Sequence, residues 1–399
     1  MLKFKYFAHK IQDVKLKDYL SVFRMISAIL LLPIFKDKYK GTWLICDTEM
    51  DARDNGYNFF SYMCHKHPER KCLFAIKKNS IDYPKIHSIG KTIEYGSIQH
   101  WIAYFLCEYN LSSQKKGKPN AAVCAFLELT GIFKPHNIYL KHGIVKDDQK
   151  WLYADRSVID ILITAAVPEA QFISEKFGYP RGVVQLTGLP RFDSLHDCKV
   201  IKNQIVIMPT WRAWLGDMPS ERQKDIETDF EKTEYYLKWR ELLESQKLKE
   251  LSKKYHLRII FYPHMNMQKH IQYFRGVGNH VLIATKKEYD IQVLLQTSCM
   301  MITDYSSVFF DMIYMKKPVI YYQFDEKTFR KYHYQEGWFD YHNNPFGNSF
   351  SNSQDVLCEL EKIINNGFEV SKDYLIAHKK IFKYWDTNNC SRIYNLLTN

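Results

Sequence analysis

Three apolar segments of the 399-residue chain lead into side chains that can take part in chemistry. The segment "YLKHG" ends in His142 and Gly143, "MPTWR" carries Thr210 and Arg212, and "YPH" ends in His264. An imidazole can take the proton of an attacking hydroxyl, and a guanidinium or a hydroxyl can hold phosphate oxygens. These residue types favour phosphoryl transfer over most other reactions.

A fourth segment, "MMITDYSSVFFDM" at 300–312, places Asp304, Ser306 and Ser307 at the start of an apolar stretch that contains Asp311. Ser306 can accept a hydrogen bond as the N-cap of a helix. The N–H groups of a first helical turn can also bind an anion. The two roles are compatible, so we expect Ser306 to cap the helix and Ser307 to bind a phosphate.

A fifth segment, "TGLPRFD", adds Arg191 and Asp193 near the middle of the chain.

The sequence lacks the motifs of several other common enzyme classes. The sequence contains no Walker loop, no GxGxxG after the first strand, no GxSxG and no HExxH. These absences disfavour P-loop enzymes, nicotinamide dehydrogenases, α/β-hydrolases and zinc peptidases. The nine cysteines are scattered singly without a CxxC pair, which indicates reduced thiols and predicts no metal site.

Strand-like apolar segments alternate with helical patterns along the chain, which is typical of α/β folds with parallel sheets. The predicted strands are 42–47, 71–76, 137–143, 160–165 and 182–188, then 204–209, 257–264, 280–285, 299–304 and 317–322. A long charged helix is expected at about 230–254. We predict an α/β fold of two Rossmann-like domains that face a cleft. In such folds ligands bind outside the carboxyl ends of the strands, where the candidate residues lie.

The length supports two domains, and 46% hydrophobic with 25% charged residues is a globular composition. The predicted divisions are a basic N-terminal segment, two Rossmann-like domains and a C-terminal helix, at 1–40, 41–195, 196–385 and 386–399. The sequence leaves the oligomeric state open.

The net charge of +12 predicts an anionic partner, although no nucleic-acid-binding motif accompanies it. Residues 1–40 carry nine Lys or Arg against three Asp, so this segment contributes half of the net positive charge of the chain. The eleven uncharged residues at 25–35 are fewer than the roughly 20 that a membrane-spanning helix needs. A signal peptide is disfavoured because no small-residue cleavage site follows. The alternatives are a helix at an anionic membrane surface and a helix packed on the first domain.

In order and spacing, the motifs resemble the CDP-glycerol glycerophosphotransferase family, whose members build teichoic acids and phosphate-linked capsules. The matching segments are "DARDNGYNFF", "KHG", "TGLPRFD", "MPTWR", "YPH", "ITDYSSVFFDM", "KPVIYYQFD" and "HYQEGWFDY", between about 42 and 385. The resemblance implies a GT-B type fold in which the second domain binds the donor nucleotide and the first binds the acceptor.

The resemblance also implies the reaction and the roles of residues. A hydroxyl of a lipid-linked saccharide or growing polymer would attack CDP-glycerol at the phosphorus bonded to glycerol, and CMP would leave. By motif, His142 resembles the general base and His264 a stabiliser of the donor phosphates. Ser306 and Ser307 resemble donor phosphate ligands, with Thr210 and Arg212 nearby. Asp304 and Asp311 are further candidates for donor binding. Other candidates for the cleft are Gly143, Arg191 and Asp193. No cofactor is implied beyond the donor substrate, and metal dependence stays open.

Two departures from the family pattern leave the donor open. Ile144 stands where "HGT" is usual, and Glu336 stands before Gly337 where many members carry Arg. CDP-ribitol or a sugar nucleotide is therefore the alternative donor, and a non-catalytic binding protein is a third hypothesis. The expected location is peripheral, at the cytoplasmic face of the cell membrane.

Overall fold

The computed structural model describes residues 16–115, 117–133, 135–215 and 229–398. Its internal contacts divide the chain into two compact units. The N-terminal unit comprises residues 1–144, 149–193 and 386–399, and the C-terminal unit comprises 145–148 and 194–385. The last helix of the chain therefore belongs with the N-terminal sheet, and four residues after "HGI" belong with the C-terminal unit.

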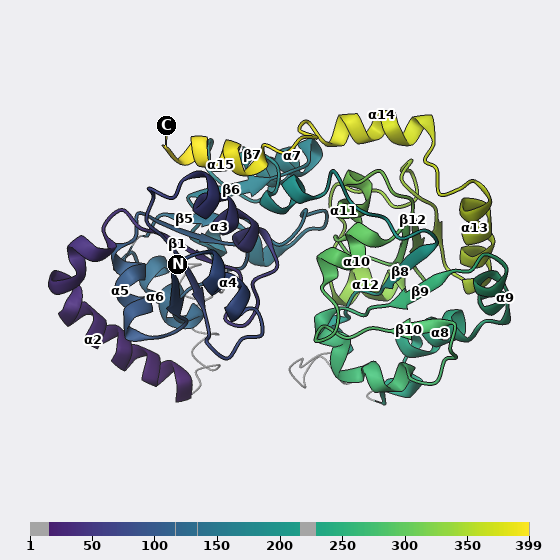
Figure 1. Ribbon diagram of the computed structural model, residues 1–399, viewed down its shortest axis with the longest axis horizontal. Coiled ribbons are helices and arrows are strands. Elements are labelled where there is room, and N and C mark those ends of the chain that lie inside the picture. The colour runs from purple at the N-terminus through teal and green to yellow at the C-terminus, as the bar shows by residue number, and fades with distance from the viewer. Residues whose placement is uncertain (1–15, 116, 134, 216–228, 399) are drawn as a thin grey trace. The chain divides into compact units, whose positions relative to one another are not determined.

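The N-terminal unit is built on a seven-stranded parallel sheet of order β3-β2-β1-β4-β5-β6-β7 (Figure 1). Its strands are β1 (Trp43–Cys46), β2 (Cys72–Ile76), β3 (Thr92–Glu94), β4 (Tyr109–Ser112), β5 (Asn137–Tyr139), β6 (Ile161–Thr164) and β7 (Val184–Leu186). All four residues of β1 are buried, as expected for an apolar strand that helices cover on both faces.

Most helices of this unit connect successive parallel strands, whereas its first helix precedes β1 and its last is the C-terminal helix of the chain. They are α2 (Leu16–Tyr39), α3 (Asn55–Lys66), α4 (Tyr83–Ile89), α5 (Ile98–Leu106), α6 (Ala121–Thr130), α7 (Val167–Lys176) and α15 (Asn389–Thr398), with short 3-10 turns at Lys150–Leu152, Ala154–Arg156 and Pro190–Ser194. Side-chain N-caps begin several of them. The Asn120 carboxamide accepts from the main-chain N–H groups of Ala122 and Val123 at 3.0 Å, for example.

The helix α2 runs beside α5 and is longer than the apolar segment 25–35 indicated (Figure 1). Its Asp18–Tyr39 portion of 22 residues is long and apolar enough to cross a membrane by length and composition. The prediction that this segment is too short to span was therefore wrong. It counted only the uncharged residues, and the helix extends past them at both ends.

The C-terminal unit has a six-stranded parallel sheet of order β10-β9-β8-β11-β12-β13. Its strands are β8 (Gln204–Met208), β9 (Arg258–Phe261), β10 (Val281–Ile283), β11 (Met300–Thr303), β12 (Val319–Tyr322) and β13 (Ser349–Phe350). Its helices are α8 (Glu234–Glu244), α9 (Gln246–Lys254), α10 (Ile291–Thr297), α11 (Phe309–Tyr314), α12 (Glu326–Tyr332), α13 (Ser353–Asn365) and α14 (Lys372–Ile381), with 3-10 helices at Ala213–Leu215, Phe230–Lys232 and η7 (Met265–Phe274).

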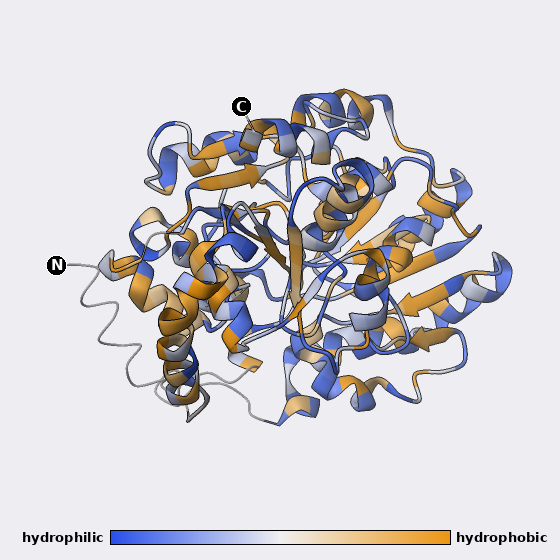
Figure 2. Ribbon diagram, turned by 60° about the vertical axis from the view of Figure 1, so that its left-hand side comes forward, coloured by the Kyte–Doolittle hydropathy of each residue, from blue (hydrophilic) through white to orange (hydrophobic). Residues whose placement is uncertain are grey.

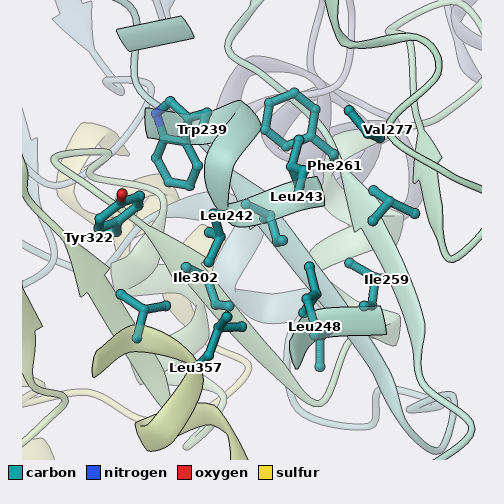
Figure 3. Packing of buried hydrophobic residues seen from close by; sticks show 14 of the residues in the cluster. Trp239, Leu242, Leu243, Leu248, Ile259, Phe261, Val277, Ile302, Tyr322 and Leu357 are labelled. Atoms are coloured by element: carbon teal, nitrogen blue, oxygen red, sulfur yellow. The ribbon is translucent and has the colours of Figure 1, made fainter. Parts of the chain in front are cut away.

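Figure 3 shows the core on one face of this second sheet. The indole of Trp239, from α8, packs edge-on to the Tyr322 ring with ring centroids 5.2 Å apart, and Phe261 and Ile302 extend the same cluster. Burial of these large side chains is the main stabilising contribution to the unit. The sheet is thereby fixed, and the loops at its carboxyl end are held on a rigid base.

The predicted fold class, α/β with two Rossmann-like domains, is confirmed by the two parallel sheets. All ten predicted strands are present, and β3, β4 and β13 were not predicted. The predicted charged helix at 230–254 is wrong in detail, because it is two helices that meet at Ser245. The N–H of Ser245 bonds to the carbonyl of Leu242 at 3.3 Å, which ends α8 there.

Candidate active site

His142 follows β5 in a turn that two long-range hydrogen bonds hold. Lys141 adopts a left-handed conformation with φ of 60°, which is uncommon for a non-glycine residue. The carbonyl of Lys141 accepts from Asn55 Nδ2 at 2.8 Å, and the carbonyl of His142 accepts from Arg191 Nη1 at 3.0 Å. The buried Gly143 comes next. The main chain on both sides of the imidazole is therefore fixed by neighbouring elements.

The side chain of Lys141 adds a buried anchor beneath this turn. It forms an ion pair with Glu169, and both side chains are almost fully excluded from solvent. Glu169 also accepts from the N–H of Ala165 at 2.9 Å, at the start of α7. Burial lowers the pKa of Lys141, while the Glu169 carboxylate acts in the opposite direction. The pair ties the turn before His142 to the beginning of a helix.

His142 keeps solvent-accessible surface, unlike Lys141, although protein atoms surround its ring. A ring N–H of His142 bonds to the main-chain carbonyl of Ser113, and the ring stacks on Trp151 with centroids 6.5 Å apart. The protein packed around the ring lowers the pKa of His142, with Arg191 and Lys141 acting in the same direction and Asp54 opposing them. The imidazole is therefore neutral near pH 7, and its second nitrogen has the lone pair that a general base requires.

Arg191 is almost completely buried and belongs to the same cluster as His142. Its Nη1 forms an ion pair with Asp54 Oδ1 at 2.9 Å. The main-chain N–H of Arg191 donates to Asn55 Oδ1 at 3.0 Å. The carboxylate of Asp193 accepts from the main-chain N–H groups of Asn389 at 2.8 Å and Cys390 at 2.9 Å, so it holds the start of α15.

Asp47, at the end of β1, connects these elements and was not predicted. It accepts main-chain N–H bonds from Asp54, Gly56 and Tyr57, and the Ser113 hydroxyl donates to it at 2.6 Å. Burial, followed by the charge of Asp54, raises the pKa of Asp47 to about 7. Asp47 therefore positions both the "DARDN" segment and Ser113, whose carbonyl orients the imidazole.

In the C-terminal unit, Arg212 is fully buried and held by carboxylates. It makes a bidentate contact with Asp325, at 2.6 and 3.0 Å, and an ion pair with Asp304 at 2.8 Å. Its Nη1 also donates to the carbonyl of Thr210 at 2.9 Å. The two carboxylates raise the pKa of Arg212 despite its burial. Arg212 and Asp304, which were predicted to bind the donor, hold the loop after β8 through these contacts.

Thr210 is the residue that this network positions. Its N–H donates to Asp304 Oδ1 at 2.8 Å, which fixes the main chain. Its hydroxyl is buried and has no hydrogen-bond partner among the described residues. The same holds for Nε2 of His333, whose Nδ1 accepts from the N–H of Ala213 at 3.0 Å. Burial, with Arg212 as the first of several nearby cations, lowers the pKa of His333 to about 3.

His264 follows β9 and begins η7. Its Nδ1 accepts from the N–H of Asn266 at 3.2 Å, which places the proton of the neutral ring on Nε2. The ring lies 6.2 Å from the indole of Trp211, which in turn packs against His333 with ring centroids 4.4 Å apart. His264 and His333 therefore both pack against Trp211, which follows Thr210 in the loop after β8.

Ser306 and Ser307 are partly exposed in a turn before α11. Ser306 Oγ accepts from the N–H of Val308 at 3.4 Å, and the helix begins at Phe309. The prediction that Ser306 is its N-cap was therefore wrong, since Val308 occupies that position. Asp311 is buried in α11 and accepts from Gln292 Nε2 at 3.4 Å, so its carboxylate does not face solvent.

Residues 145–148 and the "EGW" segment form one structural element. The indole of Trp338 donates to the carbonyl of Val145 at 2.8 Å, and Asp147 pairs with Arg330 at 2.8 Å. A Cβ at Gly337 would lie 2.0 Å from the carbonyl oxygen of Lys146, so only glycine fits there.

No group of three or more His, Cys, Asp or Glu able to hold a metal occurs within the described residues.

Comparison with known proteins places this arrangement in a family. Residues 25–399 match the family model described as CDP-Glycerol:Poly(glycerophosphate) glycerophosphotransferase. The chain belongs to this glycerophosphotransferase family. It is 32% identical over 370 residues to the minor teichoic acid biosynthesis protein GgaB of Bacillus subtilis (strain 168), which covers 90% of this chain. The chain spans 40% of the length of that relative.

Solved structures show the same fold at low sequence identity. The wall teichoic acid polymerase TagF aligns with a TM-score of 0.64 and 15% identity, over 96% of this chain and 98% of that chain. A TagF variant soaked with CDPG aligns with a TM-score of 0.62 and 14% identity, over 96% and 97% of the two chains. UDP-GlcNAc 2-epimerase from Neisseria meningitidis aligns at 0.51 and 12% identity, over 89% and 99%. The two Rossmann-like units of this glycerophosphotransferase family member are thus of the GT-B type.

Proposed function

We propose that the protein transfers glycerol phosphate from CDP-glycerol to a hydroxyl of a lipid-linked saccharide or growing teichoic-acid-type polymer, and releases CMP. The observation that carries this proposal is the neutral, oriented imidazole of His142 in a chain of the glycerophosphotransferase family. In the reaction His142 accepts the proton of the acceptor hydroxyl. The acceptor oxygen then bonds to the phosphorus that carries glycerol, and the bond from that phosphorus to CMP breaks.

The C-terminal unit supplies the donor contacts in this proposal. The Thr210 hydroxyl and His333 Nε2 are buried polar atoms without partners among the described residues, and a ligand that bonds to them would remove the cost of that burial. His264 Nε2–H can donate to a phosphate oxygen, and Ser306 and Ser307 are proposed as further phosphate ligands. Arg212 and Asp304 act by positioning Thr210.

A donor comparison tests the proposal. The purified chain is incubated with a lipid-linked acceptor and with CDP-glycerol, CDP-ribitol or a UDP-sugar, and the mass of the product is measured. We expect extension by glycerol phosphate units from CDP-glycerol. Extension only from a UDP-sugar would show that the protein is a glycosyltransferase.

The change His264→Ala is expected to lower turnover at least ~100-fold, the scale for losing a group that stabilises charge in the transition state. His256→Asn is the matched control, because His256 precedes β9, is exposed and has a φ of 51° that Asn tolerates. Turnover is measured with saturating donor. Equal turnover in the two variants would remove His264 from the site.

We also propose that α2 holds the protein at an anionic membrane surface on the cytoplasmic side. Figure 2 shows apolar residues along much of α2, and Phe23, Leu30 and Ile34 are 70%, 75% and 73% exposed. Lys36 and Lys38 follow in the last turn. Apolar burial together with basic residues is the pattern of helices at such surfaces.

Changing Phe23, Leu30 and Ile34 together to Ser is expected to lower binding to vesicles of anionic lipid at least ~10-fold, because about 0.8 kcal/mol is lost for each buried CH2. The matched control is Ile376→Ser on α14, since Ile376 is an exposed apolar residue of another helix. Binding is measured by co-sedimentation at low and high salt. Unchanged sedimentation of the triple variant would contradict the proposal.

A further inference from the structure

The N-terminal unit contains a cavity of about 240 Å³ beside the candidate base. It is lined by Asn110 and Ser112 of β4, by Tyr139 of β5 and by Ala125 of α6, and the segment around Trp151 completes it. Apolar and polar side chains contribute to the lining in similar numbers, which suits a small polar ligand. None of the predicted site residues lines this cavity.

One polar group in the lining requires a hydrogen-bond donor. Asn110 is 2% exposed, and its Nδ2 donates to Asn137 Oδ1 at 2.9 Å, which fixes the orientation of the carboxamide. Its Oδ1 is buried and has no hydrogen-bond partner among the described residues. An unsatisfied buried acceptor is costly, so a hydroxyl group of a ligand in the cavity would be favoured.

The charged residues of the lining favour an anion. Three are basic, Lys115, Lys118 and Arg156, and one is acidic, Glu128. Lys118 forms an ion pair with Glu128 at 2.6 Å, which offsets one positive charge. The Nζ of Lys115 donates to the carbonyls of Trp151 at 2.8 Å and Arg156 at 3.0 Å, which fixes the ammonium group in the lining. Arg156 lies 3.9 Å from Asp155 in a partly exposed pair, which offsets part of its charge. Three basic side chains against these two carboxylates leave a positive balance, and phosphate is the anion that Lys and Arg side chains bind well.

The cavity shares a wall with His142. Trp151 lines the cavity and stacks on the His142 ring with centroids 6.5 Å apart. Ser112 and Gln114 also line it, and they flank Ser113, whose carbonyl holds the imidazole. A ligand in the cavity therefore lies against the residues that orient the base.

We propose that this cavity binds a polyol phosphate unit of the acceptor adjacent to the reacting end, with a hydroxyl on Asn110 and the phosphate near Lys115 and Arg156. Its volume is below the roughly 300 to 1,000 Å³ of sites for drug-sized ligands, which suits one polyol phosphate and excludes a nucleotide. The assignment as an acceptor site rests on the proposed function. The binding of a polyol phosphate does not, because it follows from the lining alone.

The first test measures binding of sn-glycerol 3-phosphate to the full chain by titration calorimetry, without donor. Ala125→Leu fills the cavity, and Ala122→Leu is the matched control, because Ala122 is exposed on the same helix and does not line the cavity. A second variant, Arg156→Gln, removes a basic residue from another element. We expect wild type and Ala122→Leu to bind equally, and the other two to bind at least about tenfold more weakly.

Inorganic phosphate is the comparison ligand, and we expect it to bind more weakly than glycerol 3-phosphate because it leaves Asn110 unsatisfied. Thermal unfolding of each variant checks that the chain is folded. No binding by the wild type, or equal binding by the three variants, would overturn the proposal.

The second test separates the cavity from the proposed function. In transfer assays, Ala125→Leu is expected to raise KM for the acceptor about tenfold and to leave KM for the donor unchanged. If the chain transfers no glycerol phosphate, cavity-dependent binding of glycerol 3-phosphate still supports the site, and only the proposed function fails. A KM for the acceptor that equals the wild-type value in an active Ala125→Leu variant would overturn the acceptor assignment.

Discussion

His142→Ala is expected to lower turnover at least ~100-fold, because it removes the group that takes the proton of the acceptor hydroxyl. The binding of donor is expected to change little, since no donor contact in the proposal involves this residue. The control is His136→Ala, because His136 is exposed just before β5, at the other end of the same strand. Turnover is measured with both substrates saturating. Near-normal turnover in His142→Ala would remove the base role.

The pH profile gives an independent readout of the same residue. The pKa of His142 is lowered by the surrounding protein, with Arg191, Lys141 and Asp54 as its charged neighbours. A base works only in its deprotonated form, so activity should persist below the ordinary imidazole pKa of about 6.5 and fall only at lower pH. An acid limb centred well above that value would contradict this environment for His142.

Asp325→Ala is expected to lower the free energy of unfolding of the protein by about 3–5 kcal/mol, because it leaves the buried charge of Arg212 with one carboxylate instead of two. The matched control is Glu326→Ala, at the next position. The Glu326 side chain is 30% exposed and pairs with an exposed His342, so its loss should cost at most about 1 kcal/mol.

Urea titration of the full chain, followed by tryptophan fluorescence, measures both variants. The Asp325→Ala variant should also lose activity at temperatures where it is still folded, because Arg212 fixes the carbonyl of Thr210. If the two variants unfold at the same urea concentration, the ion pairs of Arg212 do not stabilise the folded protein as the contacts indicate.

Much of the fold could be predicted from the sequence, because buried parallel strands appear as apolar segments. The strand β4 was not predicted, since Asn110 and Ser112 interrupt its apolar character. That strand is important for the site, because it leads into Ser113 and lines the cavity beside His142. The polar residues that interrupt the apolar pattern of the strand are the ones that line the cavity.

The candidate residues could be listed from strand ends, but their roles depend on partners far away in the chain. Arg212 looks the same in sequence whether it binds a phosphate or Asp325, 113 positions later. Asp193 is held by a contact with Asn389, 196 positions away. Asp47 and Asp54 lay within or near a quoted motif and were not selected, because only the fold shows that they converge on His142.

The nucleotide released during transfer tests the central claim most directly. The protein is incubated with CDP-glycerol and a lipid-linked acceptor, and the nucleotides are separated by chromatography. Attack at the phosphorus bonded to glycerol predicts that CMP is released in step with acceptor extension, and that neither occurs in His142→Ala. Release of CDP would show attack at carbon and contradict the account.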